Sequence, residues 1–187
     1  MKPNQPIPDP RVDMRRKDRQ VTDEAWIRSF LRTAPVGVLA TMQQSQPFIN
    51  SNLFVYDEAQ HAIYMHTARL GRTRDNIDQE SQVCFSVFEM GRLLPADEAL
   101  EMSVEFNSVV VFGKAQVVKD PDEARRMLQM LLDKYFSHLS PGRDYRPIQP
   151  QELKRTAVYR IQIEAWTGKR KQVEADFPGA FYYPSSF

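Results

Sequence analysis

The sequence predicts a mainly β protein, a six-stranded antiparallel barrel with a few packed helices. Runs rich in β-branched and aromatic residues occupy positions 36–42, 48–57, 62–67, 83–89, 104–118 and 157–166. Short polar segments separate the first three runs at hairpin spacing. A doubly wound parallel sheet needs a helix at each crossover, which strands joined mostly by hairpins do not have. A closed or nearly closed barrel is therefore expected.

The first predicted helix begins at Thr22 and ends before Pro35. The Thr22 hydroxyl can cap the free N–H groups, and Val21 can pack against Trp26 as a hydrophobic staple. Proline disfavours helical backbone in the residue before it, so Pro35 stops the helix. The apolar residues then lie on one face, which should cover the barrel: Trp26, Ile27, Phe30 and Leu31.

Two more helices are expected, at 72–80 and after Asp120. Asp120-Pro121-Asp122-Glu123 has the form of a capping box with proline at the first helical position. The helix that follows has an apolar face made of Met127, Leu128, Leu131, Leu132 and Phe136. Residues 91–102 are expected to form a loop. The predicted core positions in the strands are Leu39, Val55, Cys84 and Val110.

Composition limits the possible functions. The 187 residues suit one domain, and 25 lysines and arginines nearly balance 24 aspartates and glutamates, which argues against a nucleic-acid partner. Cys84 is the single cysteine and is expected to be an inert, buried thiol in a reducing compartment. The polar start resembles no secretory signal, and no run reaches the roughly 18 apolar residues of a membrane span. We expect a cytoplasmic protein without a membrane partner.

Familiar catalytic and metal-binding motifs are absent. The chain has no G-x-G-x-x-G, no G-x-x-x-x-G-K and no nucleophile elbow. His61 and His66 are five residues apart, which places them on opposite faces of a strand, and His138 is isolated. No metal site is predicted.

The segment 63–77 is the most informative part of the sequence. A strand ends at His66 and Thr67, and a short loop leads to a helix that opens with Arg72, Thr73 and Arg74. A helix N-terminus offers free N–H donors, and arginine adds charge-assisted hydrogen bonds, so the segment is a candidate phosphate site. The alternative is a solvated basic turn in which the two arginines pair with Asp75 or Asp78.

Residues 34–42, 46–57, 63–77 and 83–87, in this order, resemble the pyridoxamine 5′-phosphate oxidase-related split barrels that bind FMN. They are most similar to the Nim branch, the 5-nitroimidazole resistance proteins. Residues 14–20, 108–115 and 167–169 extend the resemblance, which covers positions 14 to 171. It implies a split form of the predicted barrel, an FMN cofactor and a homodimer.

The resemblance also implies roles for individual residues. The strand Ile49, Asn50, Ser51 and Asn52 would lie along the flavin ring and ribityl chain. Arg72 and Thr73 match the phosphate-binding positions, with Asn76 one helical turn further on. His66 matches the histidine implicated in chemistry beside the flavin and is the catalytic candidate, with a structural histidine as the alternative. The other implied flavin contacts are Thr67, Ser108, Trp166 and Lys169, of which Ser108 matches a position that reaches the flavin of a partner subunit.

Two features depart from the family pattern. The second phosphate position is commonly lysine and is Thr73 here, a loss for which Arg74 could compensate. The C-terminus also lacks the arginine-and-proline motif for pyridoxine phosphate, which argues against a vitamin B6 oxidase. The expected organisation is an N-terminal arm (1–20), an FMN-binding barrel (21–172) and an aromatic tail (173–187) that packs on the barrel or on the dimer mate.

The leading functional hypothesis is an FMN-dependent reductase of small electrophiles such as nitroaromatic compounds, with NADH or NADPH as electron donor. One alternative is a non-enzymatic protein that sequesters FMN. Another is a haem-binding split barrel.

Overall fold

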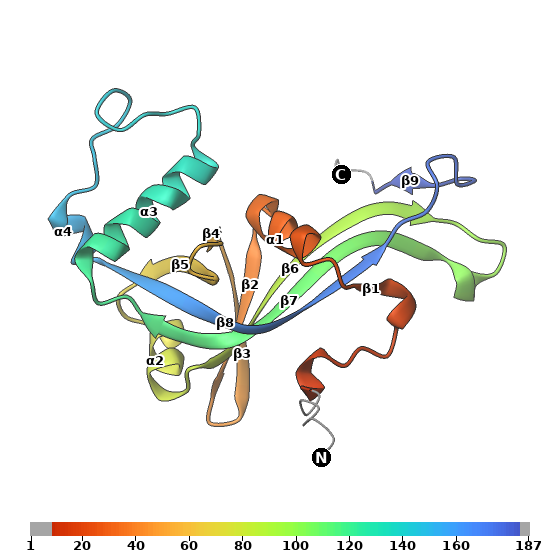
Figure 1. Cartoon of the computed structure of the whole chain (residues 1–187), viewed down its shortest axis with the longest axis horizontal. Coiled ribbons are helices and arrows are strands. Elements are labelled where there is room, and N and C mark those ends of the chain that lie inside the picture. The colour runs from red at the N-terminus through yellow and green to blue at the C-terminus, as the bar shows by residue number, and fades with distance from the viewer. Residues whose placement is uncertain (1–8, 184–187) are drawn as a thin grey trace, which may run out of the picture.

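A computed structural model describes residues 9–183 and shows one twisted antiparallel sheet with four α-helices around it (Figure 1). The helices are α1 (Glu24–Thr33), α2 (Arg72–Gln79), α3 (Pro121–Tyr135) and α4 (Pro150–Leu153). The longer strands are β2 (Gly37–Gln43), β3 (Gln46–Asn52), β4 (Phe54–Asp57), β5 (Ala62–Ala68), β6 (Gln82–Leu94), β7 (Ser103–Val117) and β8 (Thr156–Lys171). Two short strands, β1 (Gln20–Val21) and β9 (Phe181–Tyr182), pair with β8 and β6.

The sheet has the order β3-β2-β6-β7-β8-β5-β4. The two edge strands, β3 and β4, are not paired with each other and are joined through Leu53 alone. The barrel is therefore split at this point, which confirms the predicted class. The predicted number of six strands is wrong, because the run 48–57 divides at Leu53 and the short strands β1 and β9 join the sheet, giving nine.

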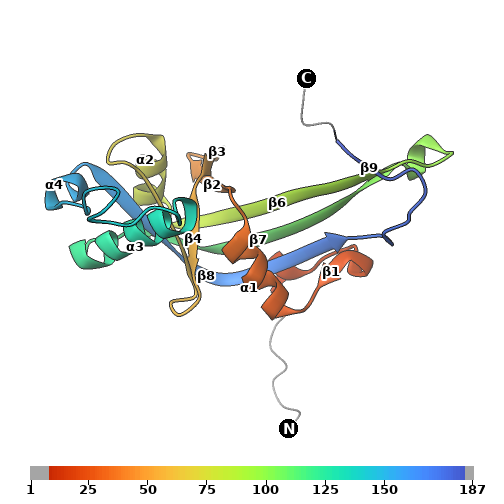
Figure 2. The same cartoon turned by 90° about the horizontal axis from the view of Figure 1, so that it is seen from above.

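The sheet extends well beyond the barrel on one side (Figure 2). β6 and β7 stay paired as far as Leu94 and Ser103, with a register shift between Met90 and Leu93. Residues 91–94 are therefore strand and not loop, which corrects the prediction for 91–102. This part of the strand is not evident from the sequence, because Gly91 and Arg92 interrupt the alternation of apolar and polar residues. We call residues 88–108 the projection.

The barrel interior is filled from the strands and from α1. Ile27, Phe30 and Leu31 of α1 are buried in the same cluster as Leu39 and Phe85. The cap lies one residue later than predicted and the helix begins at Glu24, because the Asp23 carboxylate, not Thr22, accepts the N–H groups of Ala25 (2.8 Å) and Trp26 (3.3 Å). The apolar face of α1 is as predicted.

A second apolar layer lies between α3 and the outer face of the sheet. Met127 and Leu131 pack there with Val55, Tyr64 and Val158. Asp120 caps the helix by accepting the N–H of Asp122 at 3.0 Å. The predicted capping box is not formed, because the Glu123 carboxylate instead accepts a hydrogen bond from the Tyr64 hydroxyl at 2.8 Å.

Two of the four predicted core residues face the wrong way. Leu39 and Val55 are buried, whereas Cys84 and Val110 are only half-buried. Phe85 and Val109, their sequence neighbours, point inward instead. Both strands have apolar residues on both faces, so the sequence pattern does not show which of the alternating residues point into the barrel.

The two terminal regions lie along the sheet. Gln20 and Val21 pair with Lys169 and Gly168, and Met14 is buried. Arg16 and Lys17 form ion pairs with Asp18 and Asp13. The tail reaches β6 through β9, and positions 1–8 and 184–187 of the predicted arm and tail lie outside the described residues. Within residues 9–183, no helix has the length and apolar character needed to cross a membrane.

Candidate functional site

The N-terminus of α2 meets the edge strand β3 in a polar cluster. Gly71 precedes the helix at φ 128°, a conformation that favours glycine, and no side chain caps the first turn. The free N–H groups of this turn and the positive end of the helix suit an anion. Alternation along β3 sets its face, since Phe48, Asn50 and Asn52 are half-buried while the residues between them are exposed.

Hydrogen bonds tie the helix to the strands. The Asn50 side-chain amide donates to the Thr73 hydroxyl at 3.3 Å, and the Asn52 amide donates to the Asn50 carbonyl at 2.9 Å. Asn76 is completely buried and donates to the Thr41 hydroxyl at 2.8 Å. Its Oδ1 has no partner among residues 9–183. The cluster therefore contains one buried polar atom whose hydrogen-bonding capacity is unused.

The two arginines of this segment behave differently. Arg74 forms an ion pair with Asp78 at 2.6 Å, as the solvated-turn alternative expected. Arg72 is exposed, with its guanidinium 5.1 Å from the centre of the Phe48 ring, and has no carboxylate partner within residues 9–183. Arg72 is the cation of the cluster that remains available for a phosphate.

His66 and Thr67 are adjacent in β5 but point to opposite faces of the sheet. The Thr67 hydroxyl lies 3.2 Å from the hydroxyl of the buried Tyr159, on the barrel side. His66 instead lines a cavity of about 350 Å³ beneath α3, together with Leu53, Leu131 and Tyr135. More than a third of the residue is accessible, yet partial burial of the ring lowers the pKa of His66. Burial therefore favours the neutral form of the imidazole.

The cavity and the polar cluster come close to each other at one point of the chain. Leu53, on the cavity wall, directly follows Asn52 of the cluster. None of Asn50, Asn52, Arg72, Thr73 and Asn76 lines the cavity itself. Ile49 and Ser51 belong to neither the cavity nor the cluster, because both are exposed on the other face of β3.

Trp166, Ser108 and Lys169 lie elsewhere in the chain. The Trp166 ring packs against His61, with centroids 4.7 Å apart, at the opposite end of β5 from His66. The two histidines are five positions apart, about 16 Å if the chain between them is extended. Ser108 and Lys169 are cross-strand neighbours at the base of the projection. One chain therefore does not bring these three residues to the α2 cluster.

The structure also adds residues that the sequence analysis did not select. Thr41 accepts the hydrogen bond from Asn76, and Phe48 stacks with Arg72. Thr41 could have been found as a polar residue at an inward position of an apolar strand, and it is one of three buried polar residues among residues 9–183. The stacking of Phe48 leaves no signal in the sequence. Within residues 9–183, no three histidine, cysteine or acidic side chains gather as a metal site.

The fold and the cluster define a class: an antiparallel split barrel with an uncapped helix N-terminus beside its open edge. The sequence matches the family described as pyridoxamine 5′-phosphate oxidase over residues 23–170. This chain belongs to that family. No curated protein matches the sequence.

Several solved structures share the fold. A flavocytochrome, Anf3, from Azotobacter vinelandii is 21% identical, with a TM-score of 0.78 over 94% of this chain and 86% of that one. An FAD and haem binding protein from Mycobacterium smegmatis is 21% identical, with a TM-score of 0.73 over 83% and 74%. A candidate 5-nitroimidazole antibiotic resistance protein from Bacteroides thetaiotaomicron is 17% identical, with a TM-score of 0.67 over 81% and 86%. At these identities the likeness concerns the fold.

Proposed function

We propose that the protein is an FMN-dependent reductase of small electrophiles, including nitroaromatic compounds, that takes its electrons from NADH or NADPH. The observation that carries the flavin assignment is Arg72, a cation without a carboxylate partner among the described residues, beside the uncapped start of α2. Similar structures include a flavocytochrome and an FAD and haem binding protein, which supports a flavin as the ligand.

The donor set fits a phosphorylated flavin. The phosphate would accept the free N–H groups of α2 and a charge-assisted bond from Arg72. Asn50 and Asn52 lie on the adjoining edge strand, β3. Its unpaired edge is available to the flat, polar ring of the flavin. When bound, FMN supplies the electron-transfer chemistry. The chain would contribute position, the His66 imidazole and a cavity lined mainly by apolar side chains.

Two matched variants test the phosphate assignment. Arg72→Gln should weaken FMN binding by about ten- to a hundredfold, since a hydrogen bond to a charged group contributes roughly 1.5–3 kcal/mol. Arg74→Gln removes the same charge two residues further along α2, and should change FMN affinity by about twofold at most, because Arg74 pairs with Asp78. Titration followed by flavin fluorescence measures the FMN affinity of both variants. The same titration with FAD measures their FAD affinity.

Riboflavin is the second control because it lacks the phosphate. Its affinity should be the same in wild type and in Arg72→Gln. Equal losses of FMN and riboflavin binding would make Arg72 a structural residue and place the phosphate elsewhere. A wild-type protein that binds neither FMN nor FAD at high micromolar concentration would contradict the flavin assignment itself.

Reductase activity needs its own measurement. The FMN-loaded protein should oxidise NADH or NADPH in the presence of a 5-nitroimidazole. His66→Ala should retain FMN binding while turnover falls. Stoichiometric FMN binding with no turnover of any electrophile would instead support the sequestering protein.

A haem-binding function is the second candidate, and the His66 cavity favours it. The His66 imidazole, whose neutral form burial favours, would hold the haem iron from the wall of this cavity. Addition of haemin should then give a shifted Soret band that His66→Ala removes. His61→Ala is the matched control, because burial also lowers the pKa of His61, which packs on Trp166 far from this cavity. Identical spectra for the three proteins would exclude this candidate.

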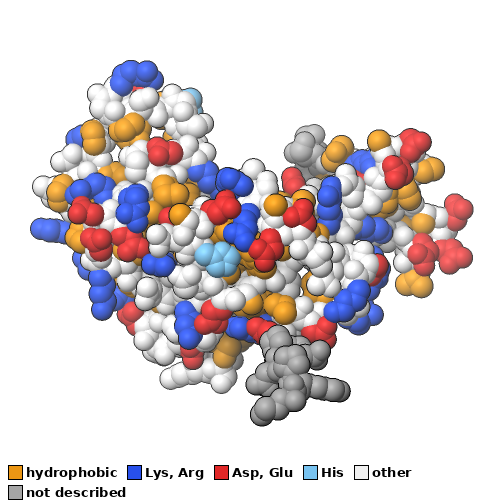
Figure 3. Space-filling view, viewed as in Figure 1, with side chains coloured by type: hydrophobic (Ala, Val, Ile, Leu, Met, Phe, Trp, Pro, Cys, Tyr) orange, Lys and Arg blue, Asp and Glu red, His pale blue; other side chains and the backbone are white. Residues whose placement is uncertain are grey.

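We propose further that the functional unit is a homodimer. Large apolar side chains of the projection are exposed, among them Phe88 (60%), Met90 (45%) and Met102 (60%). Acidic side chains gather at its tip, in the region of Asp97, Glu98 and Glu101, and exposed apolar side chains lie among and beside them (Figure 3). A second copy that covers this surface could bring Ser108 and Lys169 to the α2 cluster. Light scattering should give twice the chain mass, and a monomer in the presence of FMN would contradict the proposal.

A further inference from the structure

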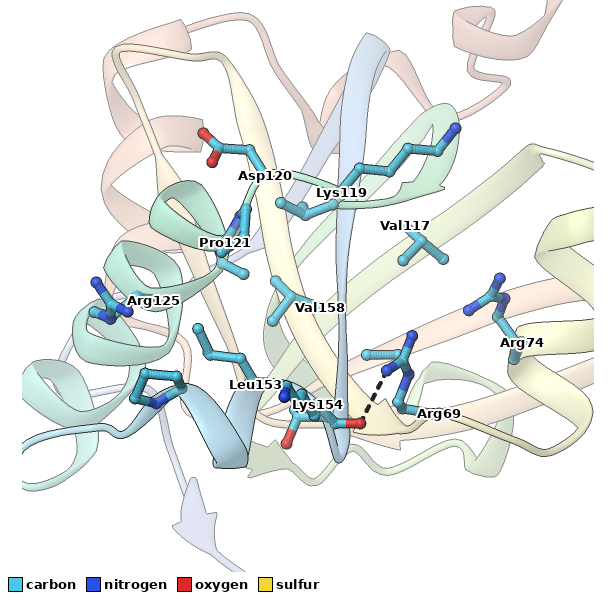
Figure 4. A pocket seen from close by; sticks show the side chains of 15 residues that line it. Arg69, Arg74, Val117, Lys119, Asp120, Pro121, Arg125, Leu153, Lys154 and Val158 are labelled. Atoms are coloured by element: carbon cyan, nitrogen blue, oxygen red, sulfur yellow. Dashed lines mark hydrogen bonds between the residues drawn. The ribbon is translucent and has the colours of Figure 1, made fainter.

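A cavity of about 490 Å³ lies on the other flank of α2, away from the cluster around Arg72 (Figure 4). α3, α4 and the first residues of β8 form its walls and floor. The floor is apolar and consists of Val117, Val118, Ala124, Leu153 and Val158. Arg72 and the residues of β3 do not line it, so it is separate from the proposed flavin site.

The rim of this cavity is strongly basic. Five cationic side chains line it, Arg69, Arg74, Lys119, Arg125 and Lys154, against a single carboxylate, Asp120. The guanidinium groups of Arg69 and Arg74 extend from the same side toward the space in front of Val158 (Figure 4). Cations gathered over an apolar floor, in a chain whose overall charge is nearly balanced, set up a local field that attracts anions.

Most of this charge is not neutralised internally. Arg74 and Arg125 have carboxylate partners, Asp78 and Asp122. Arg69 donates to the Lys154 backbone carbonyl at 2.9 Å, a neutral acceptor. Within residues 9–183, neither Arg69 nor the ammonium groups of Lys119 and Lys154 form an ion pair.

One of these cations, Arg125, also has a hydrogen-bond donor without an acceptor. The Nε of Arg125, on the α3 wall, is buried and has no acceptor in the part of the chain that the structure describes. A buried donor without an acceptor is costly, and an acceptor group near the wall would relieve that cost. The Asp120 carboxylate accepts the Asp122 N–H as the cap of α3 and, within residues 9–183, forms no ion pair with the rim cations.

We propose that this cavity binds a small organic anion with an apolar body, a carboxylate or a phosphate monoester. The apolar body lies on Val118, Leu153 and Val158. The oxyanion is held at the rim by Arg69 and Lys154. The pairing follows the general form of small-molecule sites, where apolar walls supply affinity and a few charged groups fix orientation. The site is independent of the proposed flavin function.

Calorimetric titration with 2-naphthoate tests the proposal on the full chain. We expect saturable binding, and binding of the uncharged 2-naphthamide that is about tenfold weaker or more, because the amide loses the charge-assisted bonds. Titration with 2-naphthyl phosphate distinguishes the two anion classes, since the preferred headgroup binds more tightly. No binding of either anion at millimolar concentration would overturn the proposal, as would equal binding of naphthoate and naphthamide.

Charge-neutralising variants locate the site. Arg69→Gln and Lys154→Gln should each weaken naphthoate binding by about tenfold. Arg126→Gln is the matched control, because Arg126 is an exposed neighbour of Arg125 on α3 that does not line the cavity, and it should change binding by less than about twofold. Leu153→Glu places a carboxylate on the floor and should abolish binding, whereas Leu153→Gln should only weaken it. Equal affinities across these variants would place the anion elsewhere.

Competition with FMN completes the test. Naphthoate affinity should be the same in the absence and presence of saturating FMN. If FMN displaces naphthoate competitively, the cavity is a part of the flavin site and the proposal of a separate site is wrong.

Discussion

The barrel and the projection are built from the same strands, but the barrel buries its apolar side chains and the projection leaves several of them exposed. In β6, Phe85 is completely buried against Phe54, with ring centroids 4.9 Å apart, while Phe88 is 60% exposed. Phe88 lies three positions after Phe85 in the same strand and therefore on its opposite face. The difference comes from what covers each face: α1 and the closing strands cover the barrel, and nothing within residues 9–183 covers the projection to the same extent.

The largest expected contrast is between alanine substitutions of these two phenylalanines. Phe85→Ala should lower the free energy of unfolding by about 3–5 kcal/mol, because it leaves a cavity in a close-packed core. Phe88→Ala should lower that of the isolated chain by about 0.5 kcal/mol or less, since it removes an exposed ring. Urea denaturation at low protein concentration measures both.

The same two phenylalanines, Phe85 and Phe88, also test the dimer proposal. Phe88→Asp should shift the light-scattering mass toward the monomer while the barrel stays folded by circular dichroism. An unchanged dimer would show that the projection is not its interface. Comparable losses of stability in Phe85→Ala and Phe88→Ala would contradict the division into a covered and an uncovered region.

A half-buried lysine near the end of α3, Lys134, gives the next effect. The Lys134 ammonium donates to the carbonyls of Ala34 (2.8 Å) and Phe54 (3.1 Å), and burial lowers its pKa to about 8. Between pH 8 and 10.5 the unfolded chain therefore binds a proton at this site that the folded chain has released. The free energy of unfolding should rise across this window, by at most about 3 kcal/mol.

Substitution separates this contribution from other titrations. Lys134→Met should remove the rise between pH 8 and 10.5 in urea-denaturation profiles. Lys17→Met is the control, since Lys17 is exposed, and its profile should keep the wild-type slope. A wild-type profile without any rise in this window would mean that Lys134 stays protonated in the folded barrel.

The smallest effect is expected on the projection, where an ion pair holds the tail. Arg92 bonds to Glu105 at 2.8 Å and also donates to the carbonyl oxygens of Glu174 and Ala175. The Glu105 carboxylate accepts the Val173 N–H at 2.9 Å. Glu105→Gln should speed hydrogen exchange of residues 173–183 with almost no change in melting temperature. Glu101→Gln, at the exposed tip, should leave the exchange rates unchanged.

The pH dependence of the tail contact follows from the same pair. Hydrogen bonds from Arg92 and from the Val173 N–H lower the pKa of Glu105 to about 2. The contact therefore persists above pH 4.5 and is lost as the pH falls from 4.5 through 2. Tail exchange, corrected for the intrinsic effect of pH, should accelerate only within that range. Acceleration already at pH 6 would mean that another group holds the tail.

The sequence was most informative where local chemistry determines local structure. The apolar stripe of α1, the proline-started α3 and the strand–loop–helix segment around Arg72 all form near their predicted positions. The prediction was wrong where apolar residues occupy both faces of a strand. Cys84 and Phe85 are equally compatible with a core, and only the packing of α1 and β2 against β6 decides which one points inward.

The candidate site shows the same division. The sequence by itself determined a basic helix start after a strand, because glycine, arginine and threonine act within a few residues of one another. Only the tertiary structure decided that Arg74 pairs with Asp78 and lines a second cavity while Arg72 stays unpaired beside Phe48. It also decided that Thr41 and Asn50, both more than twenty residues away, complete the cluster. Contacts between distant segments depend on how the barrel closes, and closure is a property of the whole sheet that no local stretch of sequence encodes.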